Sequence, residues 1–239
     1  MRNTNRSGRT AIIFPILALC LAQSAKANPI VIFNSGTDNT GNVLSTGSVD
    51  PHYPLVSSPI GSGAAFVVDL GSGSPITPSG PWLADNSVSE WTAPAADQSH
   101  FTTLGQYDYH TTFSLAGLNP STAVLEGNWT SDNAAVIDLN GNPTGNTLSS
   151  EPFGAFSPFF ITSGFTSGVN VLDFIVTNSP AGSAIADPTR LNVDFTSAAA
   201  SPSTSPSIPE PSAFAIMLAG IGGLSWFRRR RPKRMLAGC

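Results

Sequence analysis

An acid–histidine pair in this chain has a spacing that suits catalysis. Asp108 and His110 lie two residues apart, and residues with this spacing share one face of a strand. Such a pair also forms an ordinary surface hydrogen bond. The sequence contains no G-x-S-x-G elbow, no H-E-x-x-H and no P-loop. The sequence therefore predicts no catalytic residue, although paired carboxylates for glycoside hydrolysis stay open because their separation is spatial.

Aromatic side chains offer a second kind of chemistry, because the C–H faces of sugar rings pack on aromatic planes. The candidates for ligand stacking are Trp82, Tyr107, Tyr109 and Trp129. Tyr107 and Tyr109 share a strand face, and Trp82 lies in a loop-like stretch after Pro81. The alternative for each ring is a place in the core. We expect a surface lined by aromatic and carboxylate groups to bind polysaccharide.

Oxygen ligands of the kind that Ca²⁺ prefers occur between residues 132 and 140. Asp132 and Asp138 are the candidate metal ligands, with Asn133 and Asn140 beside them. Their spacing does not fit an EF-hand, and Asp and Asn also cap turns without any ion. The sequence predicts no cofactor, and a structural Ca²⁺ stays an alternative.

Charge and cysteine content exclude several classes of function. Arg190 is the one Lys or Arg between Asn28 and Pro209, against fourteen Asp and Glu, so this body carries a net charge near −13. Such a surface repels nucleic acid. Cys20 and Cys239 lie in segments that we expect to be removed, which excludes disulfides and thiolate sites from the mature domain.

The body that must position these groups is predicted to be all-β, an antiparallel β-sandwich of the jelly-roll kind. Short β-branched and aromatic runs alternate with Gly, Pro, Ser, Thr and Asn. The predicted strands are Ile30–Phe33, Ala64–Leu70, Ser87–Thr92, Gln106–Phe113, Ala123–Trp129, Ala134–Leu139, Phe159–Thr162, Val169–Asn178 and Arg190–Thr196.

Two of these segments resemble the galactose-binding-like jelly roll of many carbohydrate-binding modules. There a D-N-x-x-V-x-L-N-G hairpin precedes a G-x-N-x-L-x-F-x-V-x-N strand. The matching residues are Asp132, Asn133, Val136, Leu139, Asn140, Gly141, Gly168, Asn170, Leu172, Phe174, Val176 and Asn178. The resemblance covers about residues 105–196 and implies the fold, because these positions build turns and core.

The C-terminal segment is typical of a sorting signal in three parts. Pro209-Glu210-Pro211 holds the backbone extended and exposed, because neither proline can continue a helix. The uncharged run 213–227 follows, and as a helix it would span roughly 22 Å of the roughly 30 Å hydrocarbon core. The cluster Arg228, Arg229, Arg230 and Arg231 then forms a cytoplasmic stop.

This arrangement over residues 208–231 resembles the PEP-CTERM sorting tail of Gram-negative bacteria, with Ile208 where the pattern usually has Val. The resemblance implies recognition by an exosortase and processing at or near Pro209, Glu210 and Pro211. It also implies association with exopolysaccharide and biofilm. The alternative is a permanent single-pass anchor in the inner membrane.

The N-terminal segment is typical of a secretory signal peptide. Arg2, Arg6 and Arg9 precede an apolar stretch, and Ala25-Lys26-Ala27 forms an A-x-A cleavage site, so Asn28 begins the mature chain. The Sec translocon and signal peptidase are the expected partners. The predicted units are a signal peptide (1–27), a β-sandwich (28–196), a Ser/Pro linker (197–207) and a sorting signal with a transmembrane helix (208–234).

These observations predict an exported, non-catalytic protein of the cell envelope or extracellular matrix, anchored transiently in the inner membrane. The alternative is a secreted carbohydrate-active hydrolase that uses paired carboxylates. Two buried carboxylates facing one cleft would favour the hydrolase, whereas dispersed surface carboxylates would favour the binding protein.

Overall fold

The computed structural model describes residues 27–68, 82–97, 102–149, 152–180 and 186–203. Within them the chain forms strands and one short 3₁₀ turn, η1 (Pro120–Thr122). The strands are β1 (Asn28–Pro29), β2 (Val49–Ser57), β3 (Gly63–Val68), β4 (Trp91–Ala93), β5 (Thr102–Thr103), β6 (Gly105–Ser114), β7 (Val124–Asp132), β8 (Ala134–Leu139), β9 (Asn142–Leu148), β10 (Ser157–Ile161), β11 (Val169–Asn178), β12 (Ala186–Asp187) and β13 (Arg190–Ala200).

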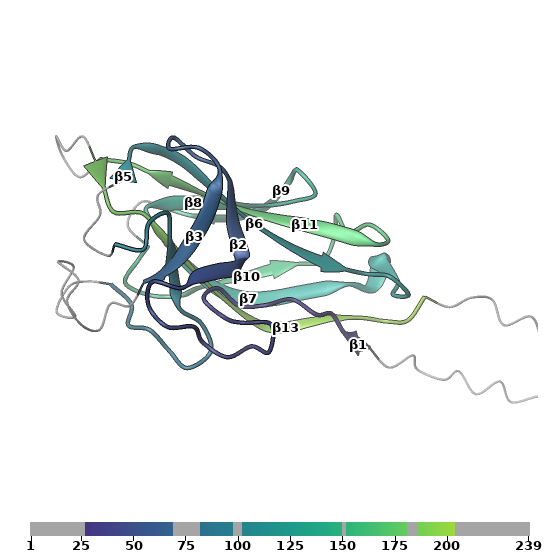
Figure 1. Cartoon of the computed structure of the whole chain (residues 1–239). Helices are drawn as coiled ribbons and strands as arrows, with labels where there is room; N and C mark the ends of the chain where they lie inside the picture. Colours follow the sequence, from purple (N-terminus) through teal and green to yellow (C-terminus); the bar gives the residue numbers. More distant parts are fainter. Residues whose placement is uncertain (1–26, 69–81, 98–101, 150–151, 181–185, 204–239) are drawn as a thin grey trace, which may run out of the picture.

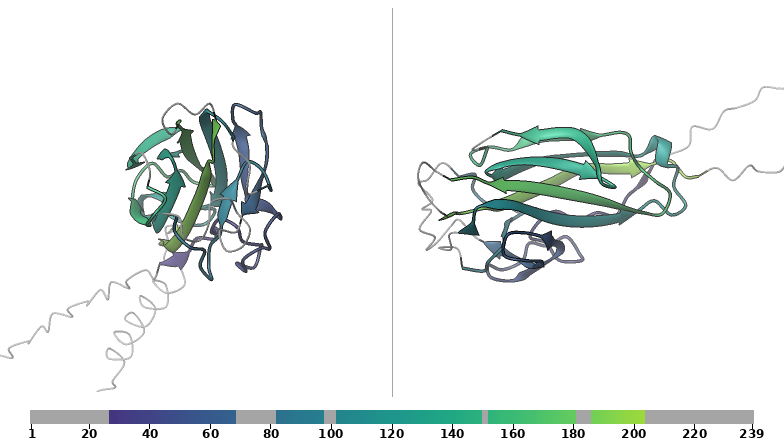
Figure 2. Two further views of the ribbon diagram at one scale, coloured as in Figure 1. Left: turned by 90° about the vertical axis from the view of Figure 1, so that its left-hand side faces the viewer. Right: turned by 90° about the horizontal axis from the view of Figure 1, so that it is seen from above.

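Most strands belong to a single antiparallel sheet that folds over on itself. Its order is β10-β7-β13-β4-β3-β2-β6-β11-β8-β9, with β1 added beside β13, while β12 and β5 form a separate pair. The layer β10-β7-β13 faces the layer β6-β11-β8-β9, and β4, β3 and β2 connect them (Figures 1 and 2). The predicted antiparallel β-sandwich is confirmed.

Alternating side chains fill the space between the two layers. On β11, Leu172, Phe174 and Val176 are fully buried, as their period of two predicts. The ring of Phe174 lies 5.9 Å from the ring of Trp129 on β7, centroid to centroid, and 6.4 Å from that of Phe159 on β10. Phe174 therefore joins the two layers at the centre of the core.

Several predicted strand boundaries were wrong. The segment 30–33 is no strand, because only Asn28 and Pro29 pair with β13. The chain turns at residues 86–89, where the Asn86 side chain accepts hydrogen bonds from two backbone N–H groups, so β4 begins at Trp91. β13 continues to Ala200, four residues into the predicted linker.

The strand registers give the sandwich two distinct ends. Asn28 pairs with Ala200, Leu118 bridges to Pro202, and the N–H of Ser203 donates to the carbonyl of Gly117 at 2.9 Å. The described chain therefore begins and finishes at one end, which we call the tail end (Figure 1). The opposite end, where β13 starts at Arg190 and pairs with Asp132, we call the far end. The eleven residues of β13 separate the two ends by about 30 Å.

Candidate functional site

An aromatic cluster occupies the far end of the sandwich. The ring of Trp82 stacks on that of Phe153 with centroids 5.1 Å apart and planes 18° apart. The ring of Trp91 meets Trp82 edge-on at 5.1 Å, and its indole N–H donates to the carbonyl of Leu83 at 2.9 Å. The cluster joins β4 to the segments 82–83 and 152–155. It holds these segments against the outer side of β13.

Arg190 lies within this cluster with its guanidinium carbon 5.1 Å from the centre of the Trp82 ring. Its side chain is almost fully buried, at 2% exposure, and Asp132 is its partner in the strand register. Burial lowers the pKa of Arg190, while the negative charge of Asp132 raises it. Because Arg190 is the one Lys or Arg of the body, no such cation lies on the described surface.

A cleft of about 450 Å³ lies beside the cluster. It follows the seam between β9 and β10, the two outermost strands of the sheet, and we call it the seam cleft. Among the described residues that line it, three have hydroxyl side chains and none is charged: Thr147, Leu148, Ser149, Pro152, Gly154, Ala155 and Ser157. Phe153, between two lining residues, connects the cleft to the Trp82 stack.

The chemistry of the seam cleft suits a neutral, polyhydroxylated ligand. Hydroxyls both donate and accept hydrogen bonds, as sugar hydroxyls do, and a neighbouring aromatic pair supplies an apolar wall. Ligand sites in proteins combine such walls with a few polar groups that fix orientation.

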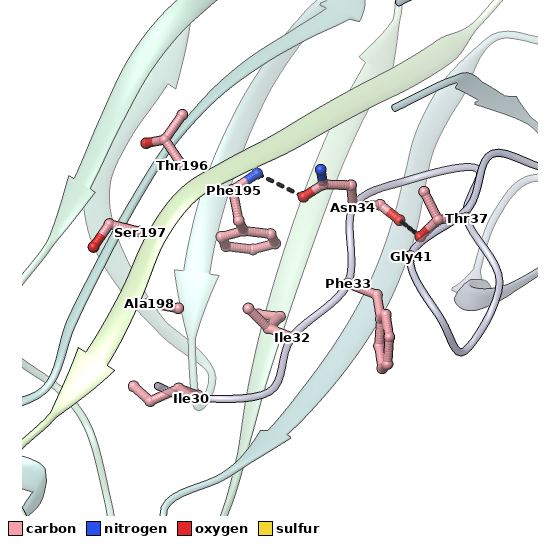
Figure 3. Close-up of a pocket in the computed structure, with 10 residues that line it drawn as sticks. All are labelled: Ile30, Ile32, Phe33, Asn34, Thr37, Gly41, Phe195, Thr196, Ser197 and Ala198. Carbon is pink, nitrogen blue, oxygen red and sulfur yellow. Dashed lines mark hydrogen bonds between the residues drawn. The ribbon is translucent and has the colours of Figure 1, made fainter. Parts of the chain in front are cut away.

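A groove of about 280 Å³ with mixed polar and apolar lining opens beside β13, near the tail end (Figure 3). Ile30 donates its N–H to the carbonyl of Ala198 at 2.9 Å, and Phe195 donates its N–H to the side chain of Asn34 at 2.7 Å. Between these contacts the segment 31–33 bows away from β13. The register of β13 against β7 also shifts between Phe195 and Ser197. The groove is lined by Ile30, Ile32, Phe33, Asn34, Thr37, Gly41, Phe195, Thr196, Ser197 and Ala198.

The predicted Asp108–His110 pair lies on the outer face of the second layer. Nδ1 of His110 lies 2.8 Å from a carboxylate oxygen of Asp173 on β11, which in turn is in register with Asp138 on β8. Burial and the charge of Asp173 raise the pKa of Asp108 to about 6, although His110 lowers it. Asp108, His110, Asp138 and Asp173 form what we call the acidic row.

Three of the four aromatic residues predicted to stack on sugar lie in the core. Tyr107, Tyr109 and Trp129 are 0%, 0% and 1% exposed, so protein atoms cover their rings. This burial revises the prediction, because alternation along a strand places two residues on one face without telling which face is solvated. Trp82 is half-buried within the far-end cluster.

The predicted Ca²⁺ ligands Asp132 and Asp138 are not brought together. Asp132 is 3% exposed at the far end and accepts a hydrogen bond from the Asn133 amide at 2.8 Å. Asp138 lies on the outer face of β8, about 13 Å of strand beyond Ala134. Among the described residues no group of three or more His, Cys, Asp or Glu could hold a metal ion.

The two fully buried carboxylates are held by separate local partners. Asp50 is 1% exposed and accepts hydrogen bonds from the N–H groups of Gly36 at 2.7 Å and His52 at 2.9 Å. Asp132 lies across the register from Arg190. Neither residue lines the seam cleft or the groove.

Residues of the seam cleft were missed by sequence reasoning. Thr147, Ser149 and Ser157 fall in turn-like, uncharged segments, and nothing in the sequence indicates that β9 and β10 meet. Arg190 carried a usable signal, because a lone cation among fourteen acidic residues is expected to be paired and buried.

The predicted sorting residues lie largely outside the described residues. They are Pro209, Glu210, Pro211, Arg228, Arg229, Arg230, Arg231 and Ala25, whereas Ala27 is described and exposed beside β1. The predicted transmembrane helix also lies outside them. Within the described part of the chain no helix is long and apolar enough to cross a membrane.

Comparison with known families decides the nature of the C-terminal segment. Residues 207–231 match the PEP-CTERM protein-sorting motif. The predicted PEP-CTERM tail is thereby confirmed. The motif indicates export, sorting by an exosortase-type enzyme and transient anchoring in the membrane.

No curated protein matches the chain. Two solved structures are similar to it. One is a CBM35 from Paenibacillus barcinonensis, with 14% identity and a TM-score of 0.31, covering 69% of this chain and 97% of that one. The other is a family 35 carbohydrate-binding module from an environmental isolate, with 12% identity and a TM-score of 0.26, covering 59% and 88%. Likenesses this weak carry no argument about a ligand.

Proposed function

We propose that this chain is an exported, non-catalytic envelope or matrix protein, sorted through its PEP-CTERM tail, whose β-sandwich presents a polysaccharide-binding site at the far end. The observation that carries the proposal is the match of residues 207–231 to the sorting motif. The geometry of the ends supports it. Asn28, the first residue of the expected mature chain, pairs with Ala200, seven residues before the motif match begins. The far end lies about 30 Å from this pair along β13.

The proposed ligand is a neutral polysaccharide in the seam cleft beside the Trp82–Phe153 stack. Hydroxyls of Thr147, Ser149 and Ser157 supply hydrogen bonds, and the described lining residues carry no charge. Anionic polymers are disfavoured, because the described surface has no Lys or Arg to pair with them.

Intact mass spectrometry tests the sorting part of the proposal. The protein from its native host is compared with protein from a strain that lacks the exosortase. We expect mature protein without residues 1–27 and without the tail beyond the Pro-Glu-Pro site, and a retained tail in the mutant strain. A full-length tail in both strains would instead make the chain a permanent inner-membrane protein and would contradict a role in the envelope or matrix.

Affinity electrophoresis tests the ligand. The mature protein is run in gels that contain neutral glucan, xylan or galactomannan, with anionic alginate as a comparison. We expect retardation by at least one neutral polymer and none by alginate. In Ala155→Trp an indole fills the cleft from an exposed position, and retardation should disappear, whereas Ile60→Trp, on the exposed β2–β3 turn, should behave as wild type. Equal retardation of both variants would show that the polysaccharide does not bind in the seam cleft.

One observation favours the hydrolase as a second candidate. Asp108 has a pKa raised to about 6, and Asp173 is its diagonal neighbour across the β6–β11 register. Residues at such diagonal positions lie roughly 7–8 Å apart, and the two carboxyl groups of glycosidases are about 5–9.5 Å apart. Release of reducing sugar from any of these polymers, lost in Asp108→Asn, would support this candidate over the binding protein.

A further inference from the structure

The loops and strand ends at the tail end of the sandwich carry no charged side chain. The registers place four loops and strand ends there: the β6–β7 connection (115–123), the β8–β9 turn (140–141), the β10–β11 connection (162–168) and the segment 197–203 beside residues 28–33. None of the fourteen acidic residues of the body falls in these segments. In a domain with net charge near −13, one acidic residue borders these loops, because Glu126 on β7 is in register with Ser197, and the α-amino group of Asn28 adds a positive charge in the mature chain.

Few residues separate the described chain from the sorting motif. Ser203 is held against the β6–β7 connection by its 2.9 Å hydrogen bond to Gly117, and the motif match begins at Ser207. Four residue steps reach at most about 14 Å in a fully extended chain, and Pro209 lies within about 22 Å. These upper limits follow from covalent geometry alone. Any enzyme that encloses the Pro-Glu-Pro motif must therefore approach the tail end closely.

Apolar groups are exposed beside the exit point of the chain. Val169, at the start of β11, is 67% exposed, and Val31 is 71% exposed. Val31 belongs to the segment that forms one wall of the groove in Figure 3, whose other wall is β13 from Phe195 to Ala198. Interface cores between proteins are depleted of charged residues, because a charge buried without a partner is costly. Loops without charged side chains and with exposed aliphatic groups meet that requirement.

We propose that the tail end is a docking surface for the membrane enzyme that reads the Pro-Glu-Pro motif. This inference rests on the proposed sorting function and adds that the folded domain contributes to recognition. The short tether brings the loops 115–123 and 162–168 against the enzyme while the motif occupies its active site. The partner is a protein surface rather than a lipid surface, because the motif that must be enclosed lies closer to the domain than the apolar run that enters the bilayer.

Charge introduced at the tail end tests the docking surface. Val169→Glu and Ser167→Glu each place a carboxylate at an exposed position of this end. The matched control is Ile60→Glu, because Ile60 is 55% exposed on the β2–β3 turn near the far end. Processing is followed in the native host by pulse-chase and intact mass. We expect both tail-end variants to be processed roughly fivefold more slowly or worse, and the control to match wild type. Thermal unfolding of each purified variant verifies its fold.

Lengthening the tether separates docking from other effects of the added charge. About fifteen Gly/Ser residues inserted between Ser203 and Thr204 add roughly 20 Å of average reach. With this insertion the domain no longer has to touch the enzyme, so Val169→Glu should be processed as fast as its parent with the same insertion. If Val169→Glu is still processed more slowly than its parent when both carry the long tether, the docking surface is overturned.

Photo-crosslinking identifies the partner. A photo-reactive residue is placed at position 167 in the full chain, and in parallel at position 60, together with an inactive sorting enzyme. We expect crosslinks to the enzyme from position 167 alone. Crosslinks only to lipid would overturn the proposal and assign the tail end to the membrane surface. If wild-type protein keeps its tail, the sorting function itself fails. If wild type is processed and Val169→Glu keeps pace with it, only the docking surface fails.

Discussion

The side-chain amide of Asn146 on β9 hydrogen bonds with the backbone of Phe160 on β10 in both directions. Its Nδ2 donates to the carbonyl of Phe160 at 3.3 Å, and its Oδ1 accepts from the N–H of Phe160 at 3.3 Å. β9 and β10 are the two outermost strands of the sheet order, and no backbone strand pairing connects them. The side chain of Asn146 therefore joins the two edges of the sheet. Pro158, two residues before Phe160, has no N–H to offer at this edge. The open edges are thus protected from pairing with another chain.

Removal of this link should loosen the seam. Asn146→Ala loses both hydrogen bonds to Phe160 and a third, local one from its Nδ2 to Oγ1 of Thr144. At about 1 kcal/mol for each bond across the seam, we expect a loss of about 1–2 kcal/mol in the free energy of unfolding and more self-association. Urea unfolding and light scattering measure the two effects. Asn142→Ala on the same strand is the control, because Asn142 bonds only locally, to the carbonyl of Asn140. Equal effects in the two variants would show that the bridge contributes nothing of its own.

Gly127 on β7 is required by close packing rather than by backbone conformation. A Cβ atom there would lie 2.5 Å from the ring of Phe159 and 2.6 Å from the carbonyl oxygen of Asp194. Gly127→Ala should therefore cost about 1–3 kcal/mol of stability through overpacking, measured by urea unfolding. Gly63→Ala is the control, because a Cβ atom at that position would have no neighbour within 4 Å. A wild-type midpoint for Gly127→Ala would contradict the tight contact between β7 and its neighbours.

The strands with regular alternation were predictable from the sequence. β6 and β11 alternate apolar core residues with polar ones over ten residues each, and the sequence placed both within a residue or so of their ends. β2 was missed because Pro51 and Pro54 interrupt it, and its pairing with β3 and β6 is irregular. β9 was missed because Pro143 and Gly145 are typical of a turn, whereas they belong to a strand with a bulge against β8.

The candidate site depended on contacts that no local pattern encodes. Trp82 was identified from its loop context, but its partners Phe153 and Arg190 are distant in the sequence. The seam cleft exists because the sheet curls until β9 approaches β10, which is a property of the whole topology. The sorting motif, in contrast, is a contiguous signal that a sequence alone carries.

Arg190 should contribute strongly to the stability of the far end. Arg190→Ala leaves Asp132 buried without its cation and removes the contact with the Trp82 ring, so we expect a loss of about 3–5 kcal/mol in urea unfolding. Arg190→Met combined with Asp132→Asn removes both charges and keeps the volume, so it should recover most of that loss. A double variant as unstable as Arg190→Ala would place the cost in packing rather than in the uncompensated carboxylate.

The raised pKa of Asp108 predicts a pH dependence of stability with a definite sign. Its pKa rises from 3.8 to about 6 because of burial and the charge of Asp173, with Asp138 adding to the rise and His110 opposing it. Between about pH 4 and pH 6 the folded protein keeps a proton that the unfolded chain releases. The contribution of Asp108 to the free energy of unfolding is therefore fully present below pH 4 and is lost as the pH rises through 6. Asp108→Asn removes the cost of ionising this carboxyl in the folded protein. After allowance for solvent screening at this half-buried site, the variant should gain about 1 kcal/mol at pH 7 and nothing at pH 4.

Urea unfolding of wild type and variant at pH 4, 5, 6 and 7 measures this gain, and Asp38→Asn provides a control of opposite sign. Hydrogen bonds from Thr40 and Asn42 hold the pKa of Asp38 below 3.8, so its contribution is present above that pH and is lost as the pH falls. Asp38→Asn should accordingly gain nothing at pH 7. A gain from Asp108→Asn that is equal at pH 4 and pH 7 would show that the pKa of Asp108 is not raised in the folded protein, and Asp108 would then be unsuited to act as the acid of a hydrolase.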